Sequence, residues 1–216
     1  MSTDHAIEPL SSAAIPESVA LAHAVGWPDD DAEWRVIHEA ALVLGVRREG
    51  RLIAQGALGS YEHNVGTIAK MIVLPGLQRQ GLGAAILDAL LAEAELRSLT
   101  TLGLVATPLG QPLYESRGFA VTGEVVVFIG TPAPERADES MPPITDLDSV
   151  VAFERRLLGC ARGAMLRGRQ REASASAVHG SVDGGVRGFA LATPKEPYAL
   201  VGPVIADAED IARRLV

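Results

Sequence analysis

The positions of apolar residues predict helices followed by three strands in the first part of the chain. Residues 5–9 fit a short strand, and apolar residues at helical spacing then run from 19 to 25. Residues 26–34 predict a turn and the start of a second helix, with Asp29 to Asp31 near its N-terminus. Residues 41–61 predict a hairpin with its turn at 48–50, and residues 65–75 predict a third strand.

The best-marked helix follows residue 81. Its apolar residues recur every three or four positions and so share one face: Leu82, Ala85, Ile86, Ala89 and Leu90. Beyond it we expect a short buried strand over residues 102–106 and a short helix over 108–116, which ends near Gly118. Residues 119–130 predict two further short strands or one bent strand.

A change of composition at residues 131–143 predicts a linker, because this stretch has four prolines, several charges and no apolar period. We therefore expect one domain at 1–130 and another at 144–216. The second begins with an amphipathic helix capped by Asp146 or Asp148. An arginine-rich helix, three strands and a final helix then follow, in an order that loosely repeats the first domain.

Composition narrows the classes of function. The net charge of -8 disfavours nucleic acid as a partner, because phosphate binding requires a basic face. The single cysteine, Cys160, excludes an internal disulfide and suits a reducing cytoplasm, where we expect the protein to reside. No apolar run reaches the ~18 residues of a membrane span, and the polar start is unlike a signal peptide, so no membrane partner is expected.

Candidate chemistry begins at the turn QRQGLGA, residues 78–84, which follows the apolar run AKMIVLP. Its glycine spacing fits neither a Walker loop nor the three-glycine dinucleotide motif. A helix that starts here presents unpaired N–H groups to an anion, Gly81 and Gly83 leave the backbone open, and Arg79 adds charge. A plain strand-to-helix turn is the alternative.

A second motif lies one predicted strand later. Together, IVLPGLQRQGLGAAIL (residues 72–87) and PLYESRGF (residues 112–119) resemble the GNAT superfamily of acetyl-CoA-dependent N-acetyltransferases, over residues 7–130. The resemblance implies an α/β (α+β) GNAT fold with a mixed central sheet flanked by helices. It also implies acetyl-CoA as cosubstrate and direct attack of a primary amine on the thioester, without a metal.

The resemblance also implies roles for particular residues. Tyr114 matches the tyrosine that protonates the departing thiolate, a role that a phenol within hydrogen-bond reach can perform. Its alternative role is that of a packing residue on a short helix. Thr107 stands at the end of the preceding strand, where many relatives have asparagine. The expected contacts of acetyl-CoA are Met71, Ile72 and Val73 for the pantetheine and acetyl group, and Arg79, Gln80, Gly81, Leu82, Gly83 and Ala84 for the pyrophosphate. Thr107 is a further expected contact.

The resemblance to the family identifies no strong general base. Some relatives carry a catalytic glutamate where this chain has Leu102. Two groups of side chains remain candidates, and a water chain is the alternative: Glu62 and His63 at a strand corner, and Asp29, Asp30 and Glu33 near the start of the second helix.

The tail, from residue 188 to 207, resembles the C-terminal domain of tandem GNAT proteins. Its turn reads GPVIADAED, with acids in place of Gly-x-Gly, so we expect a degenerate copy that binds no cofactor. We also expect this copy to be incomplete, with no strand and tyrosine helix after its last helix. It should pack on the first domain or on a second copy of the chain, since sheet edges are seldom left bare.

Three functional readings follow from the sequence. The first is an N-acetyltransferase that acts on a small-molecule or peptide amine. The missing glutamate motivates the second, a non-catalytic acyl-CoA-binding module. The proline-rich linker and the incomplete copy motivate the third, a dimerisation module that forms a homodimer.

Overall fold

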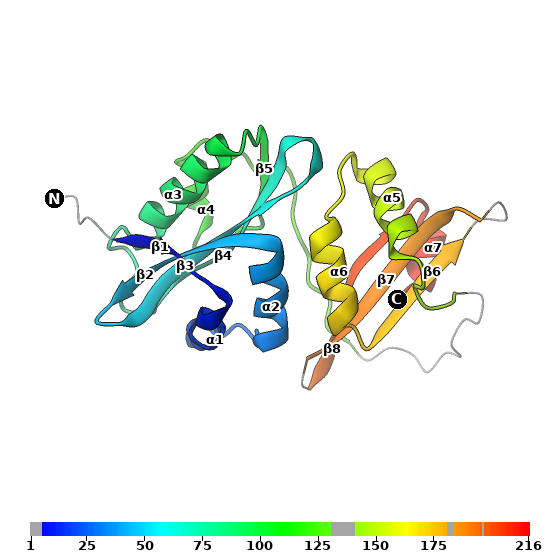
Figure 1. Ribbon diagram of the computed structural model, residues 1–216, viewed down its shortest axis with the longest axis horizontal. Coiled ribbons are helices and arrows are strands. Elements are labelled where there is room, and N and C mark those ends of the chain that lie inside the picture. Colours follow the sequence, from blue (N-terminus) through cyan, green and yellow to red (C-terminus); the bar gives the residue numbers. More distant parts are fainter. Residues whose placement is uncertain (1–5, 131–140, 181–183, 196) are drawn as a thin grey trace.

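The chain forms two units, each built on its own sheet (Figure 1). The structure is a computed structural model that describes residues 6–130, 141–180, 184–195 and 197–216. The first unit has five strands in the order β1-β2-β3-β4-β5, and the second has three in the order β6-β7-β8. The predicted mixed sheet flanked by helices is confirmed, and a second sheet follows in the C-terminal part.

The first sheet is antiparallel except at its last strand. β5 runs parallel to β4, with Val65 opposite Thr101. β2 and β3 form the predicted hairpin, with its turn at Glu49 and Gly50, both of which have positive φ. The strands are β1 (Ile7–Pro9), β2 (Ala41–Arg48), β3 (Arg51–Ser60), β4 (Val65–Val73) and β5 (Thr101–Gly103).

Helices cover both faces of this sheet, and two apolar cores result (Figure 1). On one face the core contains Leu58, Ile86 and Leu90, and on the other it contains Trp34 and Leu21. The helices are α1 (Ile15–Ala24) and α2 (Asp31–Ala40) on one face, and α3 (Leu82–Leu96) and α4 (Gln111–Glu115) on the other, with short 3-10 turns η1 (Ser12–Ala14) and η2 (Glu62–Asn64).

The second unit packs helices on a three-stranded antiparallel sheet. The Asp146 carboxylate caps its first helix by accepting a hydrogen bond from the Ser149 N–H at 3.2 Å. Phe153 and Phe189 meet edge to face in its core. Its elements match the sequence pattern: α5 (Leu147–Leu158), α6 (Gly163–Glu172), β6 (Ala175–Gly180), β7 (Val186–Lys195), β8 (Tyr198–Ala206) and α7 (Glu209–Arg214).

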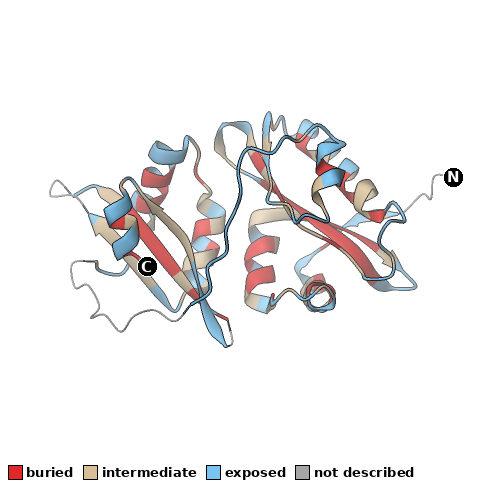
Figure 2. Cartoon of the chain, turned by 180° about the vertical axis from the view of Figure 1, so that it is seen from behind, coloured by how far each residue is buried: buried red, intermediate tan, exposed pale blue. Residues whose placement is uncertain are grey.

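Two predictions about strands are wrong. β5 covers Thr101–Gly103 rather than residues 102–106, and none of its three residues is buried. Residues 119–130 form no strand; Phe128 and Ile129 are 90% and 93% exposed (Figure 2). High β-propensity alone does not make a strand, because the backbone also needs a hydrogen-bonding partner, and this segment pairs with neither described sheet.

The two units meet where α6 lies beside α2 (Figure 1). Gly168 allows the close approach, since a Cβ at this position would lie 2.9 Å from Val36. Met165 packs against the core of the first unit. Most of the predicted linker, residues 131–140, lies outside the described residues, and the boundaries at 130 and 143 stay a prediction. In the described part of the chain, no helix has the length and apolar character to cross a membrane.

Candidate functional site

A cavity of ≈ 410 Å³ opens between β4 and the helices α3 and α4. It brings together most of the residues that the motifs single out. Predicted site residues in its wall are Met71, Val73, Arg79, Gly81, Gly83, Ala84, Thr107 and Tyr114, and the wall also includes Trp27, Ile68, Ala69, Lys70, Gln78, Val105, Leu109, Gly110 and Leu113.

The start of α3 forms one end of the cavity. Gly81 precedes the helix with φ of 85°, a left-handed conformation that favours glycine. No side chain caps this helix and its first turn has no acid, so its N–H groups and positive end remain available to an anion. Arg79 is exposed beside them, and the Gln80 amide turns away to donate to the carbonyl of Gly76 at 3.2 Å.

Three predicted residues do not line the cavity with their side chains. Ile72 is 2% exposed and points into the core under α1 and α2, because side chains alternate along a strand. Leu82 is buried in the core beneath α3. Gln80 lies on the outside of the turn. Any contact of Ile72 or Leu82 with a ligand in the cavity would therefore be made by the backbone.

Tyr114 lies on α4 at the wall of the cavity and is 9% exposed. Its ring meets Phe119 edge to face, which fixes its orientation. Burial raises the pKa of the Tyr114 phenol above its ordinary value. Thr107 stabilises the turn before α4, since its hydroxyl accepts a hydrogen bond from the Gly110 N–H at 3.3 Å.

Trp27 and Lys70 are residues in the wall that sequence reasoning did not select. Trp27 belongs to the turn GWPDDD before α2, and a lone tryptophan in a turn gives little signal of a site. Lys70 lies inside β4, where strand periodicity shows burial but not function.

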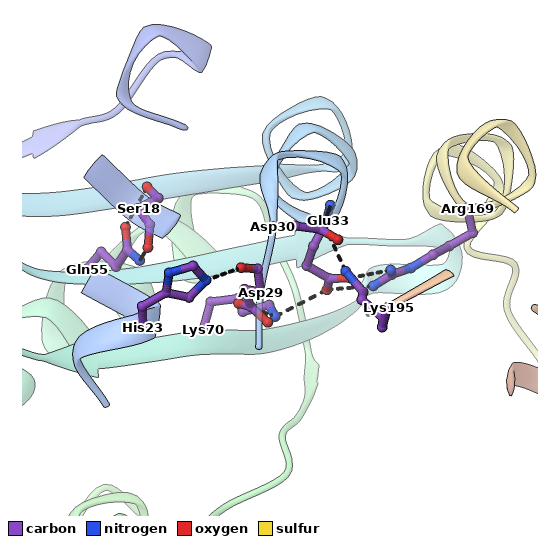
Figure 3. A network of polar contacts seen from close by, with 9 residues as sticks. All are labelled: Ser18, His23, Asp29, Asp30, Glu33, Gln55, Lys70, Arg169 and Lys195. Atoms are coloured by element: carbon purple, nitrogen blue, oxygen red, sulfur yellow. Dashed lines mark hydrogen bonds and ion pairs between the residues drawn. The ribbon is translucent and has the colours of Figure 1, made fainter. Parts of the chain in front are cut away.

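The Lys70 ammonium is held by acids of the first unit (Figure 3) and by two of its aromatic rings. It lies 2.8 Å from the Asp29 carboxylate and 3.1 Å from Glu33. It also lies over the rings of Trp27 and Trp34, at 5.8 and 5.7 Å from their centroids.

Glu33 is in turn bound from the second unit. The Arg169 guanidinium on α6 binds both of its oxygens, and Lys195 on β7 approaches at 3.9 Å while pairing with Asp30 at 2.8 Å (Figure 3). Burial alone would raise the pKa of Glu33, but the hydrogen bonds from Arg169 and the nearby Lys70 charge outweigh it and lower the pKa to about 2.

None of the five candidate bases lines the cavity. Glu62 is paired with Arg155 of the second unit, with two N···O distances of 2.6 Å, and this pairing lowers the pKa of Glu62. Glu33 is a weak base, since its pKa is about 2, and the pKa of Asp30 is lowered as well because its pairing with Lys195 outweighs burial. Asp29 is committed to Lys70 and His63 is exposed on η2.

A larger cavity, ≈ 520 Å³, lies between the two units around Tyr61, Arg155 and Arg162. It contains none of the motif residues, and both arginines are already bound to glutamates. Glu62, one of the candidate bases, lines this larger cavity, whereas the motif residues that line a cavity lie at the smaller one. In the described part of the chain, no group of three or more acids, histidines or cysteines is placed to hold a metal.

Known proteins match both halves of the chain. A family model described as an acetyltransferase (GNAT) domain matches residues 23–133, more than half of the chain, and another with the same description matches residues 150–216. An uncharacterized N-acetyltransferase of Bacillus subtilis, YitH, is 24% identical over 198 residues, which span 88% of this chain and 69% of that protein.

The fold has a counterpart among solved structures. A crystal structure from Pyrococcus horikoshii, of a protein assigned to the acetyltransferases, superposes with a TM-score of 0.77 at 18% identity. The superposition covers 100% of this chain and 75% of that one, so the arrangement of both units is shared.

Proposed function

Because the chain belongs to the GNAT acetyltransferase family, we propose that it transfers the acetyl group of acetyl-CoA to a primary amine in the cavity between β4 and α3. Bound acetyl-CoA supplies an activated acetyl thioester. The observation that carries the proposal is that one cavity joins the β4 segment, the uncapped start of α3 and Tyr114.

The residues of the cavity fit the two parts of coenzyme A. The uncapped N–H groups of α3 and the Arg79 side chain suit a pyrophosphate. Gly83 keeps the cavity open, since a Cβ there would already touch Leu113 and Val73 at 3.5 and 3.6 Å. A narrow arm such as pantetheine fits between these walls, whereas a larger side chain at Gly83 would fill the space.

The chain's contribution to catalysis is position and proton transfer. The Met71 to Val73 backbone orients the thioester, and an N–H near Val73 stabilises negative charge on its oxygen. A tyrosine phenol is protonated at neutral pH, and burial of Tyr114 keeps it so, so that its Oη can donate a proton to the departing thiolate. Since no candidate base lines the cavity, the acceptor's proton passes to water at the open end.

We propose that the acceptor is a small-molecule or peptide amine, and a screen of amines would identify it. Calorimetry with acetyl-CoA should show binding, and a panel of peptide N-termini, lysine, polyamines, aminoglycosides and amino acids should give coenzyme A release in a free-thiol assay. Binding without thiol release across the panel would favour the non-catalytic acyl-CoA-binding module. A failure to bind acetyl-CoA would overturn the proposal.

The division into domains at 1–130 and 144–216, with a cofactor-free second domain, is part of the proposal. A homodimer is supported by β8, a sheet edge on which Tyr198, Leu200 and Val201 are 44–48% exposed. Size-exclusion chromatography with light scattering checks this, and a monomer at micromolar concentration would exclude it.

A further inference from the structure

Lys70 occupies an unusual backbone conformation beside the proposed acetyl-CoA cavity. The register of β3 and β4 shifts between Gln55 and Ala57, so that Gly56 faces both Lys70 and Met71. At this bulge Lys70 has φ of 53°, which is uncommon for residues other than glycine. Such a conformation persists only where surrounding contacts hold it, and Met71, which follows, lines the cavity.

The side chain of Lys70 provides those contacts. Its ammonium binds Asp29 and Glu33 at 2.8 and 3.1 Å and lies over Trp27 and Trp34, and the side chain is only 16% exposed. An ammonium held by two carboxylates and two rings has little freedom, so the network constrains the backbone of the bulge.

The second unit completes this network. Glu33 is 7% exposed at its side chain, and Arg169 binds both of its oxygens from α6. Lys195 contributes a further cation from β7. The charges balance within the network: Asp29, Asp30 and Glu33 face Lys70, Arg169 and Lys195. Without the second unit's cations, the Glu33 carboxylate would lose the contacts that hold both of its oxygens. Glu33 could then change its position, and the Lys70 ammonium paired with it would move as well.

We infer that Arg169, assisted by Lys195, is a positioning residue for the acetyl-transfer cavity of the other unit, acting through Glu33 and Lys70 on the bulge of β4. The inference rests on the proposed function. The second unit thereby sets the shape of the Met71 to Val73 segment without binding a cofactor itself.

Intrinsic fluorescence tests the network directly, because the chain has two tryptophans and Lys70 lies over both. Arg169→Gln should change the tryptophan emission, and Arg169→Lys should restore part of it. Arg171→Gln is the matched control, since Arg171 lies on the same helix and pairs across the interface with Glu39, but neither has a contact with Lys70. The control should keep the emission of the parent chain.

Calorimetry with two probes tests the link to the cavity. Acetyl-CoA occupies both the start of α3 and the β4 segment, whereas ADP has the pyrophosphate but no pantetheine arm. Arg169→Gln should weaken acetyl-CoA binding about tenfold and leave ADP binding within twofold, while Arg171→Gln changes neither. If the parent chain binds no acetyl-CoA, the proposed function fails, but the fluorescence result still decides whether the network exists.

The inference is overturned if Arg169→Gln and Arg171→Gln behave alike in emission and in acetyl-CoA affinity. It is also overturned if Arg169→Gln weakens both probes equally, since that outcome indicates a general loss of structure. Should Arg169→Gln fail to fold, Lys195→Gln takes its place in both experiments, with the same expected direction and a smaller effect.

Discussion

The first and second units each lead a strand into a helix, and the two junctions differ in charge and in backbone geometry. After β4, Gly81 with φ of 85° starts a helix of 15 residues whose first turn has no acid. After β8, the helix has six residues and begins with Glu209 and Asp210. Asp207, the first acid of the stretch GPVIADAED, lies before this helix and pairs with Arg187 at 3.0 Å.

The difference shows how one element order supports an anion site in one place and opposes it in another. Acids at a helix start satisfy the positive end of the helix themselves. They also repel a phosphate. The same strand-to-helix connection therefore favours pyrophosphate only where the first turn is left without acids, as at α3.

The largest expected effect is a loss of turnover on substitution of Tyr114 in the first unit but not of Tyr198 in the second. Tyr114→Phe keeps the ring and its contact with Phe119 but removes the proton, so turnover should fall by about 10²-fold to 10⁴-fold with acetyl-CoA affinity unchanged. The control is Tyr198→Phe on β8, which should retain full turnover. Full activity of Tyr114→Phe in the free-thiol assay would leave Tyr114 as a packing residue only.

The next effect concerns the interface between the units and depends on pH. The pKa of Glu33 is lowered from 4.5 to about 2, so it contributes stability that is present above pH 4.5 and is lost as the pH falls toward 2, about 3 kcal/mol at most. Denaturant unfolding followed by tryptophan fluorescence at pH 7 and pH 3 should show this loss. Glu33→Gln should make this loss smaller, while the other acids of lowered pKa still contribute to it. Glu39→Gln should leave the loss unchanged, because Glu39 forms an exposed pair with Arg171; equal behaviour of the two variants would contradict the assignment.

A smaller effect on coenzyme A binding is expected when one of two glycines with similar positive φ values is replaced. Gly81→Val and Gly159→Val both replace a glycine of positive φ that has open space around it, so both should lose stability alike. Gly81→Val alone should also weaken coenzyme A binding by tenfold or more, on the order of 1.4 kcal/mol. If calorimetry gave unchanged coenzyme A affinity for Gly81→Val and for a bulky residue at Gly83, the pyrophosphate would not bind at this turn.

The smallest effect is expected when an acid like that at the start of α7 is introduced at the start of α3. Ala84→Asp places a carboxylate on the first turn of α3, as Asp210 does on α7. It should weaken coenzyme A binding several-fold, by about 1 kcal/mol, relative to the uncharged Ala84→Asn. The gap between the two variants should narrow at high salt, because screening weakens interactions between exposed charges. A gap that stays constant with salt would point to shape rather than charge.

Much of the fold was predictable because local patterns specify it. The apolar face of α3, the hairpin turn at Glu49 and Gly50, and the Asp146 cap follow from periodicity and turn chemistry. The motif residues converge on one cavity as the family resemblance implies, and two family matches confirm that resemblance for both halves. Whether Tyr114 and the other predicted residues act as proposed stays a prediction.

The sequence by itself determined the order of the elements outside residues 119–130 and the contrast between QRQGLGA and GPVIADAED, because periodicity, glycine and charge act over a few neighbouring residues. Tertiary structure alone decided that residues 119–130 pair with neither described sheet, since a strand needs a partner that propensity does not supply. It also decided that Glu33, Lys70 and Arg169 meet beside the cavity. These residues are far apart in the chain. The packing of α2 on the first sheet brings Glu33 to Lys70, and the packing of α6 on α2 brings Arg169 to Glu33.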